Sequence, residues 1–461
     1  MSQVSKVGKD MANASNALEQ HDLVYQVQCG GILRGEIRVP GDKSISHRSI
    51  MLGSLADGVT TVEGFLEGED ALCTLQAFRD MGVKIERPDT GNLIIHGVGM
   101  HGLQAPQQAL YLGNSGTSMR LLSGLLAGQR FNSVLTGDSS LSKRPMKRVA
   151  EPLRRMGADL VLQEGGLCPI HITPASLQGI DYAMPMASAQ VKSCLLLAAM
   201  YAHGETRLTE PAPCRDHTER MLQGFGYDVN VNGNEIRIKG GEKLKAGHID
   251  VPADISSAAF FLVGASICPG AELTLRHVGI NPTRIGVINV LRAMGADIHT
   301  LREYVAGGEP VADLRVRYAP LHGIVIAENQ VPLAIDEFPA LFIAAACADG
   351  ITTLTGAEEL RVKESDRIQT MADGLAVLGV KHEVKPDGIV INGVGQGGKL
   401  GAGTINSHGD HRIAMSFTMA SLRASGPLTI LDCNNVATSF PGFAELVQRC
   451  GIPLSQRSGQ A

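Results

Sequence analysis

A short motif recurs six times along this chain and constrains its architecture more than any other feature. Each copy has an apolar helix end, then a glycine, then a β-like stretch, and the glycines are Gly82, Gly157, Gly226, Gly295, Gly379 and Gly451. Successive glycines lie 75, 69, 69, 84 and 72 residues apart. Glycine suits the position after a helix, where the chain turns left-handed before a strand. Six copies at near-constant spacing indicate six repeated units.

The same order of elements precedes each glycine. In the fifth unit, residues 338–348 are the first predicted helix, 351–356 a strand, and 358–366 a polar loop that leads into a second helix. The equivalent strands of the other units are 60–64, 133–137, 206–209, 272–275 and 428–431. Alternating helices and strands predict an α/β fold. The first helices are rich in Ala, Leu, Ser and Cys on all faces, so we expect them to be buried.

Polar residues that a repeat does not need gather at the start of each first helix. The six segments are 41–44, 113–120, 188–192, 254–257, 336–339 and 409–412. Unpaired N–H groups and the helix dipole favour anions at such positions. Residues 41–48 read Gly-Asp-Lys-Ser-Ile-Ser-His-Arg, which supplies the Lys, Ser and Arg side chains that a phosphate or carboxylate site uses.

A second group of polar residues lies in the loops before the second helices. These segments are 142–145, 215–219, 281–284 and 361–367. Because equivalent positions of a repeat lie at equivalent ends of the structure, both groups can converge on one surface, or on one cleft between two groups of units. Many helix N-termini around one cleft make it electropositive. We therefore expect small ligands that carry several negative charges.

Each motif also has a simpler interpretation. Residues 41–48 alone are compatible with a capped surface helix whose charges are solvated. The hydroxyl residues Ser256, Ser257, Thr117 and Ser118 are compatible with ordinary N-caps, and Arg284 and Arg120 with structural ion pairs. Asp410-His411-Arg412 would suit a metal, but no second ligand pair accompanies it. For His47 and His217 we expect a positioning role or ordinary polar contacts.

Composition excludes several classes of protein. A net charge of −5, 4% aromatic residues and no Trp argue against nucleic-acid binding. The longest apolar runs are too short to cross a membrane. The nine cysteines include no CxxC pair, which argues against zinc and suits a reducing cytoplasm. Residues 1–23 lack the apolar core of a signal peptide and are predicted to be a loose N-terminal extension.

The motifs, in this order, closely resemble those of the 5-enolpyruvylshikimate-3-phosphate synthases, over roughly residues 24–456. The matching segments are 41–44, 113–117, 143–145, 188–190, 361–367 and 410–412. The resemblance implies a two-domain inside-out α/β barrel built from six repeats. It places domain one at residues 24–41 plus 252–456 and domain two at 42–251, with the active site in the cleft between them. It also implies a monomer.

Members of that family transfer the enolpyruvyl group of phosphoenolpyruvate to the 5-hydroxyl of shikimate 3-phosphate, through a tetrahedral intermediate, and release phosphate. The resemblance implies a shikimate 3-phosphate site formed by Lys43, Ser44, Arg48, Ser188, Ala189, Gln190, Arg215, Asp336 and Lys363. It implies a phosphoenolpyruvate site formed by Lys43, Gly116, Arg144, Gln190, Arg367 and Arg412. Both substrates carry a phosphate and a carboxylate, as the electropositive cleft predicts.

The chemistry requires one group that takes the hydroxyl proton and another that protonates the methylene carbon. We assign the first role to Asp336 and the second to Glu364, with Lys43 as its partner; no metal or organic cofactor is expected. The segments 188–192, 215–219 and 281–284 resemble a second subclass of the family. One departure is Thr438, where many members have Lys.

Two alternatives remain. The related enolpyruvyl transferases that act on UDP-N-acetylglucosamine have a reactive Cys in the loop that here spans residues 138–144, and this loop contains no Cys. The other alternative is a non-catalytic anion-binding protein on the same scaffold. Binding alone does not require Asp336 and Glu364 inside a cationic site, which favours the enzyme.

Overall fold

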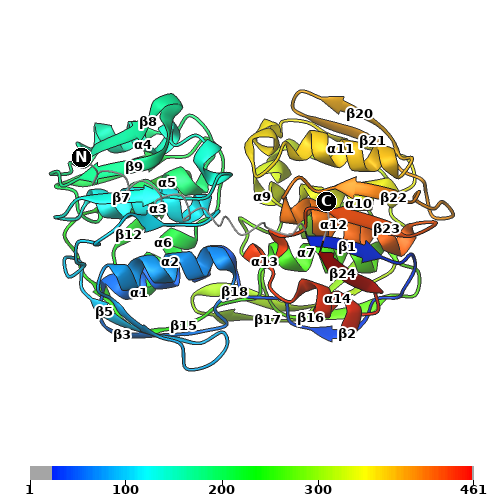
Figure 1. Cartoon of the computed structure of the whole chain (residues 1–461), viewed down its shortest axis with the longest axis horizontal. Coiled ribbons are helices and arrows are strands. Elements are labelled where there is room, and N and C mark those ends of the chain that lie inside the picture. The colour runs from blue at the N-terminus through cyan, green and yellow to red at the C-terminus, as the bar shows by residue number, and fades with distance from the viewer. Residues whose placement is uncertain (1–22, 459–461) are drawn as a thin grey trace, which may run out of the picture.

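The computed structural model describes residues 23–458, which form six β-sheets, one for each repeat (Figure 1). The glycines of the repeat, from Gly82 to Gly451, all have positive φ, between 71° and 107°. Each follows the second helix of its unit, so the predicted helix ends are confirmed. The predicted extension, residues 1–23, lies outside the described residues except for Leu23, which begins a strand.

The first helices of the units are buried, as expected. They are α1 (Lys43–Leu55), α3 (Gly116–Ala127), α5 (Ala189–Ala199), α7 (Ile255–Ile267), α10 (Phe338–Cys347) and α12 (His411–Ala420). All thirteen residues of α7 are buried. The helices α7, α10 and α12 pack on one another, and α3 packs on both α1 and α5. Helices that bury residues on every side therefore occupy the interior.

The second helices lie nearer the surface and are amphipathic. They are α2 (Glu69–Asp80), α4 (Lys147–Arg155), α6 (His217–Gly224), α8 (Gly286–Ala293), α11 (Arg367–Val377) and α14 (Phe443–Arg449). The remaining helices are short: α9 (Val331–Ala334), α13 (Val436–Ser439), and the 3-10 turns η1 (Leu141–Lys143), η2 (Glu164–Gly166), η3 (Glu328–Gln330), η4 (Glu358–Val362) and η5 (Ser421–Arg423).

Buried apolar side chains form two clusters, which define two lobes. Lobe one has its core in residues 25–39 and 253–454, and lobe two in residues 45–251. The two lobes stand side by side in Figure 1. The independent domains predicted at residues 24–41 plus 252–456 and at 42–251 stay a prediction.

Three sheets belong to lobe one, and the N-terminal strands complete two of them. The strands of the first sheet, in spatial order, are β22 (Gly403–Asn406), β23 (Leu428–Leu431), β1 (Leu23–Val27) and β24 (Leu454–Ser458). Those of the second are β17 (Asp297–Ala306), β18 (Glu309–Arg317), β16 (Glu272–Gly279) and β2 (Arg34–Ile37). Those of the third are β19 (Ile351–Leu354), β21 (Gly388–Asn392) and β20 (Lys381–Lys385). The strand β1 pairs antiparallel with β23 and β24, and β2 pairs parallel with β16.

Lobe two contains the other three sheets. The strands of the first, in spatial order, are β10 (Asp181–Ala183), β11 (Glu205–Thr209), β13 (Glu235–Lys239) and β12 (Val229–Asn232). Those of the second are β14 (Leu244–Lys245), β3 (Ala56–Glu63), β5 (Leu93–Val98) and β4 (Lys84–Glu86), and β15 (His248–Asp250) also pairs with β3. Those of the third are β6 (Leu110–Tyr111), β7 (Ser133–Thr136), β9 (Leu167–Thr173) and β8 (Asp159–Gln163).

The chain passes between the lobes twice, and the two passages pair with each other. Asp42 N–H donates to Pro252 (2.7 Å) and Asp254 N–H to Pro40 (2.9 Å), around an antiparallel bridge between Gly41 and Ala253. A Cβ at Gly41 would lie 1.9 Å from the carbonyl oxygen of Gly64, so only glycine fits there. The starts of α1 and α7 are thus held against each other at the junction.

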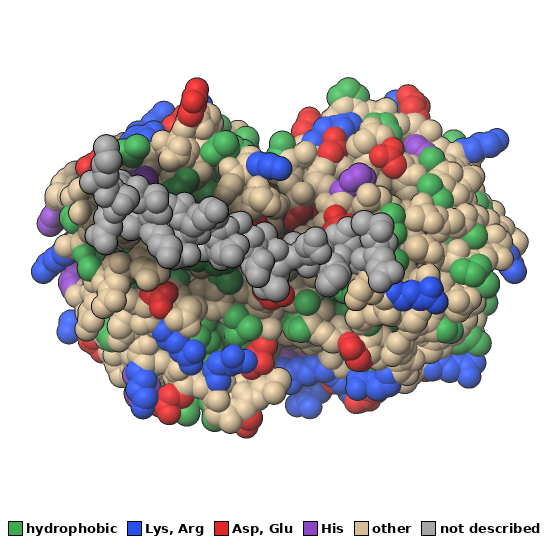
Figure 2. Space-filling model, in the orientation of Figure 1, with side chains coloured by type: hydrophobic (Ala, Val, Ile, Leu, Met, Phe, Trp, Pro, Cys, Tyr) green, Lys and Arg blue, Asp and Glu red, His purple; other side chains and the backbone are tan. Residues whose placement is uncertain are grey.

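Charged side chains of both signs are mixed over the visible face, and the outline narrows between the lobes (Figure 2). Over residues 23–458, no helix combines the length and apolarity needed to span a membrane.

Candidate active site

A cavity of about 420 Å³ lies between the lobes, and the N-termini of all six first helices reach it. Its lining includes Lys43 and Ser44 of α1, Gly116 of α3, Ser188 at the start of α5, and residues at the starts of α7, α10 and α12. The loops before four of the second helices contribute as well. The predicted convergence of both polar groups on one cleft is confirmed.

The cavity is cationic although the whole chain carries a net charge of −5. Among the described residues, nine Lys and Arg side chains line it, against six Asp and Glu side chains. The cations are Lys43, Arg120, Arg144, Arg148, Arg215, Arg284, Lys363, Arg367 and Arg412. A cleft with this excess of positive charge concentrates small anions.

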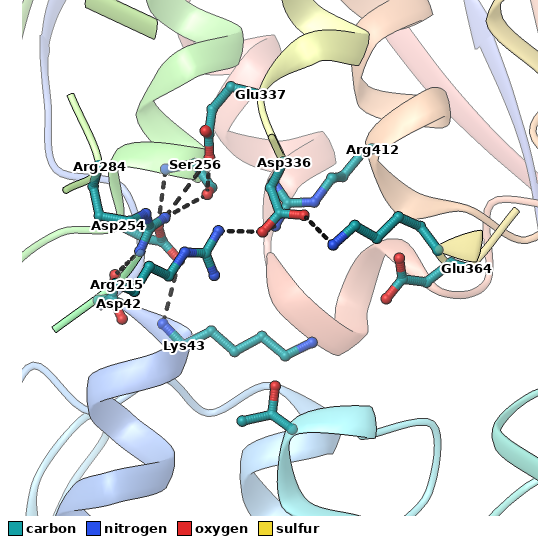
Figure 3. Close-up of polar contacts among 12 residues, drawn as sticks. Asp42, Lys43, Arg215, Asp254, Ser256, Arg284, Asp336, Glu337, Glu364 and Arg412 are labelled. Carbon is teal, nitrogen blue, oxygen red and sulfur yellow. Dashed lines mark hydrogen bonds and ion pairs between the residues drawn. The ribbon is translucent and has the colours of Figure 1, made fainter. Parts of the chain in front are cut away.

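Asp336 lies among these cations, two residues before α10 begins (Figure 3). Its carboxylate accepts from Arg215 and from Arg367 Nη1 (3.2 Å), and Lys363 Nζ (3.9 Å) and Arg412 Nη2 (4.0 Å) lie near it. Burial by itself raises the pKa of Asp336, but the neighbouring cations outweigh it and hold the pKa well below its usual range. Asp336 is therefore an anion surrounded by cationic side chains of the kind that can bind phosphate.

Glu364 is the second carboxylate, and the buried Arg367 joins it to the first. Arg367 Nη2 donates to Glu364 Oε2 (2.6 Å), while its Nε donates to Asp410 (2.8 Å). From lobe two, Arg144 Nη1 lies 3.4 Å from Glu364 Oε1. Burial opposes ionisation of Glu364, yet Arg367 and Arg144 hold its pKa well below the usual value.

On the lobe-two side, two guanidinium groups flank Gly116. A Cβ there would lie 3.0 Å from Arg120 Nη1 and 3.2 Å from Arg144 Nη1. Arg120 donates to the side-chain oxygen of Gln190, and Gln190 Nε2 donates to Thr117 Oγ1 (3.1 Å). This places an amide and two guanidinium groups beside a bare stretch of backbone, which suits close approach of an anion.

The junction between the lobes supports Lys43. Arg284 Nη1 lies 3.1 Å from Asp42, and its Nη2 lies 3.3 Å from Asp254 (Figure 3). These carboxylates cap α1 and α7, and Asp254 also accepts from the Lys43 backbone N–H (3.2 Å). The Lys43 ammonium forms an ion pair with Asp70 of α2. The partnership of Lys43 with Glu364 in proton transfer stays a prediction.

Arg48 is the predicted site residue that does not line the cavity. It is buried, and its guanidinium donates to Thr218 (2.7 Å), Ser193 (2.7 Å) and the carbonyl of Ser44 (2.9 Å). Arg48 lies about one turn into α1. Its side chain points back and stabilises the start of the helix instead of extending beyond the helix start. Arg48 therefore supports the segment that carries Lys43 and Ser44.

The simpler interpretations have different outcomes. The N-caps are Ser115 and Asp254, so ordinary capping by Thr117, Ser118, Ser256 or Ser257 was wrong. Arg284 does form structural ion pairs, whereas Arg120 has no ion pair among the described residues. No group of three or more potential metal ligands occurs within residues 23–458.

The three histidines near these motifs are buried. His47 Nδ1 lies 2.8 Å from Thr74 Oγ1, and His217 Nδ1 lies 2.7 Å from Glu309 Oε1. Both thus have the polar contacts expected of them. Burial and the neighbouring Arg412 lower the pKa of His411 to about 3, so its imidazole is neutral where it lines the cavity.

Sequence reasoning missed several cavity residues. Asp70 lies in the first turn of α2, where an acidic residue is common for helix stability alone, so no sequence signal marked it. Arg148 of lobe two reaches Glu359 of lobe one (3.1 Å), a pairing of residues 211 positions apart. Arg120 lies in segment 113–120, and no acidic residue stands three or four positions from it. That absence was the sequence signal against a structural ion pair within the helix.

A sequence model described as EPSP synthase (3-phosphoshikimate 1-carboxyvinyltransferase) matches residues 27–447. The chain belongs to the EPSP synthase family. Its relatives include the 3-phosphoshikimate 1-carboxyvinyltransferase of Methylococcus capsulatus, 64% identical over 95% of this chain and 99% of that protein. The enzyme of the same name from Nitrosococcus oceani is 61% identical over 96% and 99% of the two chains.

Solved structures agree with this family. EPSP synthase from Acinetobacter baumannii is 60% identical, with a TM-score of 0.86 over 95% of this chain and all of that one. The enolpyruvyl transferase NikO from Streptomyces tendae is 16% identical, with a TM-score of 0.77 over 95% of this chain and all of that one, and shares the fold. The α/β class with six repeats in two lobes, predicted from the sequence, is confirmed as the enolpyruvyl transferase fold.

Thr438, the departure from many EPSP synthases, does not line the cavity. It is buried, and its hydroxyl donates to the carbonyl of Asn435 (2.6 Å), the residue directly before the short helix α13. Its backbone carbonyl lies against Gly68, directly before α2, so this segment packs between the lobes. Thr438 therefore makes structural contacts in this protein.

Proposed function

We propose that this chain catalyses transfer of the enolpyruvyl group of phosphoenolpyruvate to the 5-hydroxyl of shikimate 3-phosphate, with release of phosphate, a step toward aromatic amino acids. One observation carries the proposal: the buried Arg367 holds two carboxylates, Asp336 and Glu364, inside a cationic cavity between two lobes. Phosphate and carboxylate groups of the substrates match the cations, and the carboxylates supply proton transfer.

The proposed contacts follow the two sides of the cavity. Shikimate 3-phosphate contacts the side chains or backbone of Lys43, Ser44, Ser188, Ala189, Gln190, Arg215, Asp336 and Lys363. Phosphoenolpyruvate contacts Lys43, Gly116, Arg144, Gln190, Arg367 and Arg412. All of these line the cavity. Arg48 takes part through its hydrogen bond to the Ser44 carbonyl and not by direct contact.

The first step adds the sugar hydroxyl to phosphoenolpyruvate. The 5-hydroxyl oxygen bonds to C2 of phosphoenolpyruvate, Asp336 accepts the hydroxyl proton, and Glu364 delivers a proton to the methylene carbon. The product is a tetrahedral intermediate with a methyl group. In the second step, a methyl proton returns to Glu364 as the C–O bond to phosphate breaks. The departing phosphate takes up the proton that Asp336 accepted, and the cations stabilise it.

Substrate binding brings the pKa values of both carboxylates closer to the range that proton transfer requires. The pKa values of Asp336 and Glu364 are held low by Arg215, Arg367 and Arg144. Bound phosphate and carboxylate groups add negative charge beside these cations and raise both pKa values toward the range for proton exchange. The lobes exclude water from the intermediate.

The site is built from both lobes of one chain, so we propose that a monomer is sufficient, acting in the cytoplasm, where thiols stay reduced. The nine cysteines are all free. Light scattering of the purified protein tests the monomer, and a fluorescent fusion of the whole chain in cells tests the compartment.

The test measures phosphate release from phosphoenolpyruvate in the presence of EDTA, with shikimate 3-phosphate or UDP-N-acetylglucosamine as acceptor. We expect release that depends on shikimate 3-phosphate and is insensitive to EDTA. Release with the UDP-sugar alone would favour the related transferase. Binding of shikimate 3-phosphate without release from either acceptor would favour a non-catalytic anion-binding protein.

A further inference from the structure

Lys192 belongs to a buried cluster of charged side chains. The proposed chemistry does not use this cluster. Its side chain on α5 is 2% exposed, and its ammonium forms ion pairs with Glu210 and with Glu219 Oε1 (2.6 Å). The same ammonium donates to the Cys214 carbonyl (3.2 Å). Lys192 and Glu219 belong to segments 188–192 and 215–219, whose other members include cavity residues.

Stability alone does not account for this cluster. Burying three ionised groups is costly, and apolar residues of similar size often stabilise a core as well or better. Burial lowers the pKa of Lys192, but Glu219 and the other acidic neighbours outweigh it, so the pKa is raised and the side chain stays charged. A charged Lys at this position therefore requires another explanation.

The cluster fixes the residue that precedes Arg215. The Cys214 N–H donates to Glu210 Oε2 (3.0 Å), and the Cys214 carbonyl accepts from Lys192. Glu210 is itself anchored, because its N–H donates to the Asn234 carbonyl (2.8 Å) and its carbonyl accepts from Asn234 Nδ2 (3.1 Å). The N–H and the carbonyl of Cys214 are thus both hydrogen-bonded to members of one buried ion cluster.

Arg215 leaves this anchored backbone and crosses to lobe one, where it donates to Asp336 (Figure 3). On its other side the chain enters α6, and Glu219 returns to Lys192. Lys192 therefore holds the backbone before Arg215 and the helix after it. Its own helix, α5, begins at the cavity with Ser188 as N-cap.

We propose that Lys192 is a positioning residue: through Glu210, Cys214 and Glu219 it sets the place of Arg215 relative to Ser188 and Gln190. The inference rests on the proposed function, in which these three residues contact shikimate 3-phosphate. It assigns no direct substrate contact to Lys192, which lies outside the cavity lining. The effect of losing Lys192 must pass through Arg215.

The main variant is the triple change Lys192→Met, Glu210→Gln and Glu219→Gln, since Lys192→Met alone leaves two buried carboxylates without a cation. Its circular dichroism spectrum and thermal midpoint report folding. We expect the KM for shikimate 3-phosphate to rise about 10- to 100-fold, because small misplacements of a binding group have effects of this size. The KM for phosphoenolpyruvate should change much less.

Glu219→Gln is a milder variant that keeps the Lys192–Glu210 ion pair and the shape of the side chain. We expect a rise of about threefold in the KM for shikimate 3-phosphate. If the triple variant does not fold, this variant decides the question. An unchanged KM for shikimate 3-phosphate in a folded variant would overturn the proposal.

The control Leu197→Ala destabilises the same helix from a buried apolar position. It should lower the thermal midpoint and leave both KM values unchanged. A matching rise in the KM for shikimate 3-phosphate would mean that general destabilisation explains the effect, which would also overturn the proposal.

A double-mutant cycle with Arg215→Ala decides whether Lys192 acts through Arg215. In the Arg215→Ala background we expect the triple change to raise the KM for shikimate 3-phosphate by no more than about a further twofold. If Lys192 and Arg215 acted independently, their separate effects on this KM would multiply. Calorimetric Kd values for shikimate 3-phosphate give the same comparison without turnover. An inactive wild-type protein would refute the proposed function, whereas independent effects in the cycle, judged on Kd, would refute this inference.

Discussion

Arg215 of lobe two donates to the carboxylate of Asp336 in lobe one, so the cavity is spanned by a hydrogen-bonded ion pair. The two residues are 121 positions apart in the chain. Arg144–Glu364 and Arg148–Glu359 make two further ion pairs between the lobes. Asp336 and Glu364 are therefore held by cations from both lobes.

Replacement of Arg367 by Lys should lower both activity and stability. Lys keeps one charge but cannot contact Asp336, Glu364 and Asp410 together, as the guanidinium does. We expect kcat/KM to fall by a factor on the order of 10² to 10³ and the free energy of unfolding to fall by about 3 kcal/mol. Steady-state kinetics and urea unfolding measure the two effects.

The matched control is Arg423→Lys. Arg423 is also buried in lobe one, but its guanidinium donates to backbone carbonyls outside the cavity, including that of Gly398 (2.6 Å). This variant should lose stability and keep kcat/KM. Equal losses of activity in the two variants would contradict the role given to Arg367.

Neutral isosteres of the two carboxylates should lose turnover while the fold is kept. For Asp336→Asn and Glu364→Gln we expect kcat to fall by about 10² to 10⁴, since each removes one proton-transfer group. Asp297→Asn is the control, because it removes an ion pair with Arg317 (2.8 Å) outside the cavity. Either active-site variant retaining nearly full kcat would show that its carboxylate does not transfer a proton.

Acid should destabilise the junction between the lobes. Burial alone would raise the pKa of Asp42, but His217 and Arg284 lower it to about 2. Because the pKa in the folded protein lies below the unfolded value, the stabilisation is present above about pH 4 and is lost as the pH falls toward 2. The contribution is on the order of 2 kcal/mol.

Urea unfolding between pH 2 and 6 measures this dependence. The Asp42→Asn variant should be less stable than wild type at pH 6, and the difference should shrink as the pH falls through the window set by Asp42. A constant difference across the range would show that Asp42 does not titrate with a lowered pKa.

Alanine at Gly116 should weaken the binding of phosphoenolpyruvate. The added Cβ would lie 3.0 Å from Arg120 and 3.2 Å from Arg144, so both guanidinium groups must shift by a few tenths of an ångström. We expect the KM for phosphoenolpyruvate to rise by about tenfold and the KM for shikimate 3-phosphate to change little. Gly224→Ala is the control, since a Cβ there meets no atom within 4 Å. Equal KM values in wild type and Gly116→Ala would contradict this placement.

Local signals in the sequence predicted the repeat because each has a local physical cause. Gly82 and its five equivalents take positive φ, and the residues before the first helices act as caps, so both depend on nearby backbone. Repetition then placed Lys43, Asp336 and Arg367 at equivalent ends of their units. Their meeting in one cavity followed from the architecture.

Pairings between different units could not be predicted in the same way. Asp70 meets Lys43 only because α1 packs on α2, and Arg48 turns inward because Thr218 and Ser193 lie beside it. Lys192 and Glu219 were visible as motif residues, but their contact depends on how α5 and α6 are placed. Such contacts are set by tertiary packing, which a single sequence does not specify.

Enolpyruvyl transfer can be followed through the carbon skeleton of phosphoenolpyruvate labelled with ¹³C at C2. The protein is incubated with this compound and shikimate 3-phosphate, and the products are observed by ¹³C and ³¹P NMR. We expect the label to appear in an enol ether bound to the sugar, in amounts equal to the phosphate released. Labelled pyruvate with unchanged shikimate 3-phosphate would show hydrolysis of phosphoenolpyruvate and would refute enolpyruvyl transfer by this protein.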